Sequence, residues 1–210
     1  MSNLTHADPH GHGLPPEGPL ERATLEGRNK ITLFWLFLGA ECVLFGTLFA
    51  TFIALRNSTL GGPTGSDLFD LILVAWATII LLVSSLTSVF AVQAMHSHQV
   101  GKMQLWLVVT VLLGIAFAAL EIYEFQHYIH MEHTFVSSAF GTSYYSLVGF
   151  HGAHVMFGVF WITTLILQIM KKGLTTVTAP KVYVASLYWH FIDVVWVFIF
   201  TVVYLMGIMG

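Results

Sequence analysis

Charged side chains are scarce in this sequence, and long stretches contain no lysine or arginine. Only 9% of the 210 residues are Asp, Glu, Lys or Arg, whereas 56% are hydrophobic. A soluble domain of this size needs more polar surface than that to cover its core. The composition therefore excludes an ordinary soluble protein and indicates that a lipid bilayer is the solvent.

Five apolar runs without Lys or Arg are present, at about residues 31–55, 69–94, 103–127, 141–170 and 183–208. Each is long enough for the roughly 20 residues that a helix needs to cross a bilayer. Backbone amides in lipid must be satisfied within the segment or in a closed barrel, and these runs are too long for barrel strands. We therefore predict an all-α integral membrane protein, a bundle of five transmembrane helices.

Cysteine and proline are also rare where helices are expected. The single cysteine, Cys42, excludes a disulfide framework and a cysteine-based metal site, and we interpret it as a small buried apolar residue. All six prolines lie in the N-terminal arm or in predicted loops, so we expect continuous helices. Without such interruptions, and without an internal repeat, a secondary transporter is disfavoured.

Small and hydroxyl-bearing residues within the spans indicate close approach of neighbouring helices. The glycines are Gly39, Gly46, Gly114, Gly149, Gly152 and Gly158. The hydroxyls of the second span are Thr78, Ser84, Ser85, Thr87 and Ser88. We expect faces with small residues and polar pairs to point into the bundle or toward a partner, and aromatic-rich faces to meet lipid.

Residues 1–30 are polar and rich in Pro, Gly and His, and they contain no apolar stretch of the length that a signal peptide requires. Prolines are interspersed around His6, His10 and His12, which favours a disordered arm over a metal site. The predicted organisation is thus an arm over residues 1–30 and a transmembrane domain over residues 31–210.

The basic residues predict the orientation, because cytoplasmic flanks of membrane helices are enriched in Lys and Arg. Seven of the eight fall on one side of the predicted bundle, and Arg56 alone falls on the other. The seven are Arg22, Arg28, Lys30, Lys102, Lys171, Lys172 and Lys181. We therefore predict a cytoplasmic N-terminus and, with five spans, a C-terminus on the outer face.

Seven titratable residues within the spans are the candidate functional residues. They are Glu41, Glu121, Glu124, His151, His154, His190 and Asp193. A charge near the centre of a helix costs about 2.5–3.5 kcal/mol on insertion scales, so such residues face protein or water and usually have partners. Because no Lys or Arg shares the spans, the carboxylates must be protonated, hydrogen-bonded or matched by another subunit.

Spacing gives these residues a simple structural interpretation. Six of the seven form i,i+3 pairs, which share one helix face and are suited to hydrogen bonds between helices. These pairs are Glu121 with Glu124, His151 with His154, and His190 with Asp193. Glu41 lies near the midplane, and we expect it to pair with His154 or with the pair in the fifth span.

Three chemical alternatives compete with that interpretation. His151, His154, Glu121 and Glu124 could hold a metal, although the Glu-x-x-His motif of di-iron bundles is absent from the spans. Histidines on facing helices could ligate haem, although only two spans carry them. A proton relay through carboxylates and histidines would need water or another subunit to fill the gaps in depth.

Four segments carry a resemblance to a known family. Residues 189–196, Trp-His-Phe-Ile-Asp-Val-Val-Trp, resemble the last-helix signature of subunit III in haem–copper oxidases. Residues 149–155, Gly-Phe-His-Gly-Ala-His-Val, and residues 121–124, Glu-Ile-Tyr-Glu, resemble its Gly-Phe-His-Gly-x-His-Val and Glu-x-Tyr-Glu segments. Glu41 with Val43, Leu44 and Phe45 is similar to its Glu-Val-Leu-Phe element, with Cys42 as a departure. The resemblance runs from about residue 25 to the C-terminus.

The resemblance implies a non-catalytic subunit of the cytochrome c oxidase kind, with haem and copper in partner subunits and no catalytic, cofactor or metal residue in this chain. It implies subunit I as the main contact, subunit II and small oxidase subunits nearby, bound phospholipid, and no nucleic acid. Longer relatives have two additional helices before the segment matching Leu33 to Leu55, so the five-helix form resembles bacterial versions and a prokaryotic plasma membrane.

The expected function is support of assembly, stability and proton supply during oxygen reduction coupled to proton pumping. Subunit III of a quinol oxidase is an alternative within the family. A free-standing membrane protein that binds metal or haem is the alternative from another class.

Overall fold

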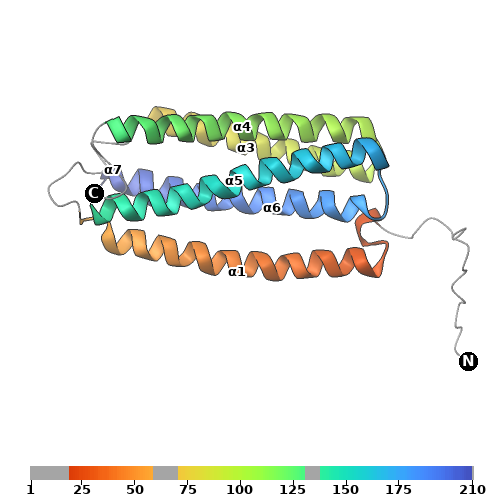
Figure 1. Ribbon diagram of the computed structural model, residues 1–210, viewed down its shortest axis with the longest axis horizontal. Coiled ribbons are helices and arrows are strands. Elements are labelled where there is room, and N and C mark those ends of the chain that lie inside the picture. The colour runs from red at the N-terminus through yellow and green to blue at the C-terminus, as the bar shows by residue number, and fades with distance from the viewer. Residues whose placement is uncertain (1–18, 59–70, 131–137, 210) are drawn as a thin grey trace, which may run out of the picture.

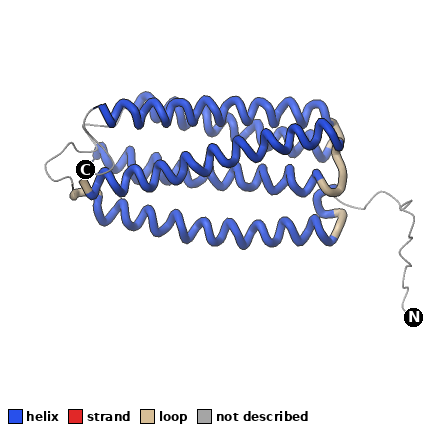
Figure 2. Tube along the Cα trace, viewed as in Figure 1, coloured by secondary structure: helices blue, strands red, loops and turns tan. Residues whose placement is uncertain are grey.

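Five long helices make up most of the chain. The computed structural model describes residues 19–58, 71–130 and 138–209. The helices are α1 (Leu25–Leu55), α3 (Leu71–His96), α4 (Val100–His130), α5 (Ala139–Lys172) and α6 (Thr178–Ile199). Figures 1 and 2 show them side by side with their long axes nearly parallel. All five spans are long and apolar enough to cross a membrane, so the predicted five-helix membrane bundle is confirmed.

Helices α5 and α6 form the middle of the bundle. α6 contacts α1, α3 and α5, while α5 contacts α1, α4 and α6. α3 and α4 pack against each other on one side, and α1 lies at the opposite edge from α4 (Figure 1). Only 17% of the most apolar stretch of α1 is buried, so this helix leaves most of its circumference to the surroundings.

One end of the bundle is formed by the short 3-10 helix η1 (Leu20–Arg22) together with two short connections. Residues 97–99 join α3 to α4, and residues 173–177 join α5 to α6. Gly173 ends α5 with φ 69°, a left-handed value that favours glycine. We call this the η1 end.

Helix α1 begins at Leu25, before the apolar run predicted from residue 31. The Thr24 Oγ1 accepts a hydrogen bond of 3.0 Å from the Gly27 amide, a normal N-cap, and Lys30 pairs with Glu26 one turn earlier. The helix therefore extends into the segment assigned to the polar arm, because capping and an ion pair stabilise its polar first turns. His6, His10 and His12 lie outside the described residues.

Two expectations about helix continuity need correction. Pro180 lies in the first turn of α6 rather than in a loop, where its missing N–H leaves no hydrogen bond unmade. The last span is not a continuous α-helix, because Phe200–Leu205 form the π-helix η2 before the short helix α7 (Met206–Met209). No proline lies at that change of winding, so the sequence contains no signal that predicts it.

The core is rich in aromatic side chains, so the expectation that aromatic-rich faces meet lipid holds only in part, since Trp35, Trp76 and Phe160 are exposed on the outside. The largest fully buried side chains include Trp189, Trp196, Tyr128, Tyr144, Tyr188, Tyr204, Phe52 and Phe117. Tryptophan and tyrosine have a polar atom that lipid cannot satisfy, so these side chains bury their rings where a partner is available. Leu and Val side chains cover much of the outside, and Leu36 and Val43 of α1 are each 69% exposed.

The glycines divide into two groups, so their common assignment to helix contacts holds only in part. A Cβ at Gly114 would lie 2.6 Å from the Trp189 ring, and one at Gly158 would lie 2.9 Å from the same ring. A Cβ at Gly39, Gly46 or Gly149 would meet nothing within 4 Å among the described residues. Cys42 is exposed rather than buried, because it lies on the outward face of α1.

Candidate functional site

Hydrogen bonds between side chains fasten α3 to α6 along most of their length. The indole Nε1 of Trp189 donates to Ser84 Oγ at 2.8 Å, and that of Trp196 donates to Thr78 Oγ1 at 3.0 Å. Nearer the η1 end, Ser88 and Ser186 share a hydrogen bond of 2.8 Å. Because the helices are antiparallel, these pairs form a ladder of polar contacts inside the bundle.

The ladder gives a specific role to the hydroxyl-bearing residues of α3, for which the sequence analysis predicted only general helix contacts. Both tryptophans belong to the segment at residues 189–196, and their acceptors are hydroxyls of the second predicted span. Comparing the spacing of the tryptophans with the spacing of the hydroxyls, taken in the opposite direction along the chain, could have indicated that these two helices are neighbours. Only the known topology shows, however, that α3 and not another helix lies beside α6.

Glu41 of α1 lies beside His154 of α5, as one of the two predicted pairings would have it. Glu41 Oε2 is 3.2 Å from His154 Nε2, and both side chains are mostly buried. The contact is at ion-pair distance but is not aligned as a hydrogen bond. Phe45 packs edge-on against the imidazole and covers the pair from the α1 side.

The hydrogen bond at the other ring nitrogen limits the protonation of this pair. His154 Nδ1 lies 2.7 Å from the carbonyl oxygen of Phe150, which can only accept, so Nδ1 carries a proton. Nε2 is then protonated only if the ring is cationic. The neutral ring therefore turns the lone pair of Nε2 toward Glu41, and only a protonated Glu41 or a cationic His154 places a hydrogen atom between the two groups.

Glu124 is the best-satisfied carboxylate of the bundle. Tyr128 Oη donates to Glu124 Oε1 at 2.6 Å, and Tyr204 Oη donates to Oε2 at 3.0 Å. Tyr144 Oη lies 3.1 Å from Tyr204 Oη and extends the network to α5. Since Tyr204 uses its proton on Glu124, Tyr144 is the donor in that second contact.

The three tyrosines of this network were missed by the sequence interpretation. Tyr204 belongs to η2, so the π-helical winding sets the direction in which its hydroxyl points. Nothing in the local sequence of residues 200–205 predicts that winding. Tyr128 could have been found, since it follows Glu124 by four residues and lies on the same helix face.

Glu121 and His151 are both buried in the middle of the bundle, on α4 and α5. The Glu121 carboxylate lies over Gly152, where a Cβ would come within 2.6 Å of Oε2. His151 Nε2 lies 3.3 Å from the Ile192 carbonyl, and its ring packs against Phe117 and Trp196. Glu121 Oε1 and His151 Nδ1 have no hydrogen-bond partner among the described residues.

His190 and Asp193 of α6 lie at different depths from the surface. Asp193 is buried and His190 is half-buried. Ser85 approaches the Asp193 carboxylate without reaching hydrogen-bond geometry, so both carboxylate oxygens lack a partner in the described part of the chain. The Nδ1 atom of His190 is also inaccessible to solvent and has no hydrogen-bond partner among the described residues.

We expected the two residues of each i,i+3 pair to share one helix face. For His151 and His154 this expectation is wrong, because the two side chains contact different helices. His151 turns toward α6, whereas His154 turns toward α1. Residues three apart on a helix still differ in direction by about 60°, enough to meet different neighbours in a tight bundle. The metal hypothesis that combined these histidines with Glu121 and Glu124 lacks its geometry, since the described residues contain no group of three potential ligands.

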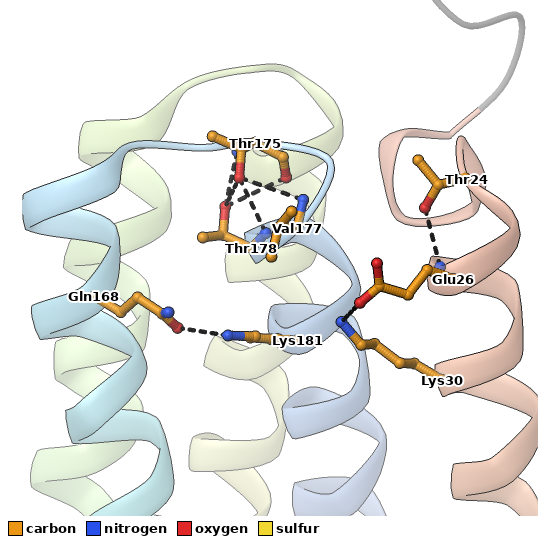
Figure 3. A network of polar contacts seen from close by, with 9 residues as sticks. Thr24, Glu26, Lys30, Gln168, Thr175, Val177, Thr178 and Lys181 are labelled. Atoms are coloured by element: carbon orange, nitrogen blue, oxygen red, sulfur yellow. Dashed lines mark hydrogen bonds and ion pairs between the residues drawn. The ribbon is translucent and has the colours of Figure 1, made fainter.

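Polar contacts of another kind gather at the η1 end. Figure 3 shows Thr175 and Thr178 tying the connection between α5 and α6, with Lys181 reaching Gln168 of α5. Glu21 of η1 is also buried at this end, and both its carboxylate oxygens lie within 3.2 Å of His96 Nε2. These contacts fix the start of the described chain to the ends of α3 and α6.

Comparison with known proteins identifies the family. The sequence model of the family described as cytochrome c oxidase subunit III matches residues 23–208. The chain belongs to this family. The resemblance seen in the sequence is thereby confirmed over nearly the same range.

Several bacterial relatives are similar over almost their whole length. The chain is 62% identical to cytochrome c oxidase subunit 3 of Bacillus subtilis over 196 residues, which are 93% of this chain and 94% of that protein. It is 58% identical to cytochrome c oxidase subunit 3 of Bacillus sp. strain PS3, covering 93% and 94%. It is 47% identical to quinol oxidase subunit 3 of Bacillus subtilis, covering 99% and 100%.

Family membership identifies the complex and the membrane to which this chain belongs. The chain is subunit III of a haem–copper oxidase and so part of an oxidoreductase complex. With five membrane-spanning helices and bacterial relatives, it is a multi-pass protein of the plasma membrane.

Proposed function

We propose that this chain is the third subunit of a bacterial cytochrome c oxidase, and that it supports oxygen reduction without carrying a redox centre. The observation that carries the proposal is the 62% identity to a cytochrome c oxidase subunit over nearly the whole of both chains. The quinol oxidase subunit of the same organism is 47% identical, which favours cytochrome c as the electron donor. Quinol oxidase remains the second candidate because that relative is matched over its full length.

The arrangement of the buried residues supports a non-redox role. Glu124 accepts from Tyr204, His151 contacts the Ile192 carbonyl and His154 contacts Glu41, so each of these side chains joins two helices. Haem and copper would then be held by partner subunits, chiefly subunit I, with subunit II and small subunits in the same complex. This chain would contribute to assembly, to stability and to the supply of protons to the catalytic subunit.

The distribution of the basic residues supports the proposed orientation in the membrane. Arg22, Arg28, Lys30, Lys102 and the lysines that flank the connection from α5 to α6 all lie at or near the η1 end. The η1 end would face the cytoplasm under the positive-inside rule, with Arg56 on the outer side. Proton uptake from the cytoplasm would occur near this end.

Phospholipid would cover the outward faces of the bundle. A groove of about 260 Å³ between α1 and α5 is lined mainly by aromatic rings, including Phe37, Phe150 and Phe157. Its walls suit an acyl chain, since apolar side chains dominate and the His154 Nδ1 proton is already used by a carbonyl.

Purification of the native complex through an affinity tag on this chain tests the proposal. We expect haem-bearing subunits to co-purify, and the complex to consume oxygen with reduced cytochrome c faster than with a quinol. Faster turnover with the quinol would favour the second candidate. A tagged chain that purifies alone and carries its own metal or haem would contradict both.

A further inference from the structure

A groove between α3 and α6 runs along the half of these helices nearer the η1 end. Its volume is about 440 Å³, and its lining includes Val89, Gln93 and His96 of α3 and Leu187 and His190 of α6. Gln93 and His96 are exposed on α3, and His190 is half-buried on α6. The groove therefore carries polar side chains within an apolar surface, and because His96 Nε2 already contacts Glu21 of η1, Gln93 and His190 are the two that it presents.

The polar groups next to the groove are already used inside the bundle. Ser186 bonds Ser88, and Trp189 bonds Ser84. His190 is different, because its Nδ1 is sealed from the surface and has no partner among the described residues. What His190 offers to a neighbour must therefore come from Nε2.

The sealed nitrogen indicates which tautomer His190 adopts. A buried N–H without an acceptor is rarer in proteins than an acceptor without a donor. The proton of the neutral ring therefore lies on Nε2, the ring nitrogen that is not sealed, and His190 presents a donor to the groove. The complementary ligand is a hydrogen-bond acceptor.

The surroundings limit what can supply that acceptor. Acyl chains offer neither donors nor acceptors, so polar side chains on a membrane-embedded face usually meet another helix. The outward face of α1 contrasts with the groove, since Leu33, Leu36 and Val43 expose only hydrocarbon. The outward positions Phe160, Leu167 and Met170 of α5 are similarly apolar.

We propose that the groove between α3 and α6 is the docking surface for a transmembrane helix of another oxidase subunit, which places a hydrogen-bond acceptor against His190. This inference rests on the proposed function, because it assumes that the chain assembles with other oxidase subunits. It names the face that they cover. The faces of α1 and α5 named above would then meet lipid.

Site-directed photocrosslinking of the assembled complex tests the assignment. Cys42→Ser removes the single cysteine, and Val89→Cys then places one thiol at the groove. Leu33→Cys on α1 and Leu167→Cys on α5 are matched controls, since both side chains are exposed at a similar height from the η1 end. Each thiol is labelled with a photoactivatable maleimide, irradiated in the membrane, and its adducts are identified by mass spectrometry.

We expect the Val89→Cys probe to be joined to a helix of another oxidase subunit and the two controls to give lipid adducts. Lipid adducts alone from the groove, or equal protein adducts from a control face, would overturn the inference while leaving the proposed function intact. A tagged chain that brings down no oxidase subunit would overturn the proposed function and, with it, the inference.

Substitutions of His190 test the hydrogen bond itself. His190→Leu should lower the yield of the protein adduct roughly five- to tenfold, as expected for one lost buried hydrogen bond. His190→Gln places an amide N–H near the position of Nε2 and should keep the yield close to that of the unsubstituted residue. If both variants lose the adduct equally while helix content stays unchanged, the acceptor contact is refuted.

Discussion

At the scale of single residues, partners differ sharply between the two carboxylates of α4. Glu124 accepts hydrogen bonds from two tyrosines on its two oxygens, whereas Glu121 Oε1 has no partner among the described residues. Donors to both oxygens stabilise the charged form of a carboxylate. Two residues of the same type, one turn apart, therefore have different hydrogen-bonding surroundings.

The tyrosine network gives the first prediction. Tyr128→Phe or Tyr204→Phe removes one donor to Glu124, and each should lower the free energy of unfolding by about 0.5–2 kcal/mol. Tyr123→Phe on the same helix is the control, since Tyr123 is 58% exposed. Thermal unfolding of the purified complex measures the effect. An equally large loss in the Tyr123 variant would show that the network contributes nothing.

The predicted site residues give a second expectation at this scale. Glu41→Gln removes the carboxyl group that contacts His154, and Asp193→Asn removes the buried carboxyl group of α6. Both should change assembly, or the rate at which activity is lost during turnover, more than they change the haem spectrum. Yield of the complex, its spectrum and its oxygen consumption over many turnovers are the readouts. A lost haem band at normal yield would contradict a supporting role for these groups.

At the scale of helices, the α3–α6 ladder should act through specific pairs. Trp196→Phe and Thr78→Val each break the same hydrogen bond, so a double-mutant cycle should give a coupling energy of about 0.5–1.5 kcal/mol. Trp196→Phe combined with Ser84→Ala is the control, because Ser84 accepts from Trp189 instead. Coupling that is as large in the control cycle would indicate general repacking rather than the ladder.

Glycine substitutions separate helix contacts from lipid-facing positions. Gly114→Ala should destabilise the bundle by about 1–3 kcal/mol, because its Cβ would lie 2.6 Å from the buried Trp189 ring and that ring has little room to move. Gly39→Ala should be neutral or stabilising by up to about 1 kcal/mol, since its Cβ meets nothing among the described residues and alanine favours helix. Melting temperatures of the two complexes provide the comparison. Similar destabilisation at both positions would contradict the packing described for α1.

The sequence predicted the helices well and their faces less well. Hydropathy located all five spans because the bilayer imposes a minimum length and requires every backbone amide to be bonded within its helix. It could not distinguish Gly114 from Gly39, since that difference depends on whether a tryptophan of another helix lies opposite. Spacing grouped His151 with His154, but their partners lie on different helices and are known only from the tertiary structure.

At the scale of the whole molecule, four helices of the bundle are tightly packed, and the fifth, α1, is largely exposed. Helices α3 to α6 share buried aromatic rings and hydrogen bonds, while α1 contributes the pair of Glu41 with His154 and exposes much of its remaining surface. Such a bundle can hold a neighbouring subunit in place without taking part in electron transfer. We therefore expect this chain to support turnover rather than to perform it.

The most direct test compares the oxidase complex with and without this chain. Haem spectra and metal content are recorded for both, and oxygen consumption is then followed across many turnovers. We expect the complex without the chain to keep every haem and copper and to begin turnover, but to lose activity sooner or to take up protons more slowly. Loss of a haem or copper on removal of the chain, with recovery when the chain is returned together with metal, would contradict a supporting role.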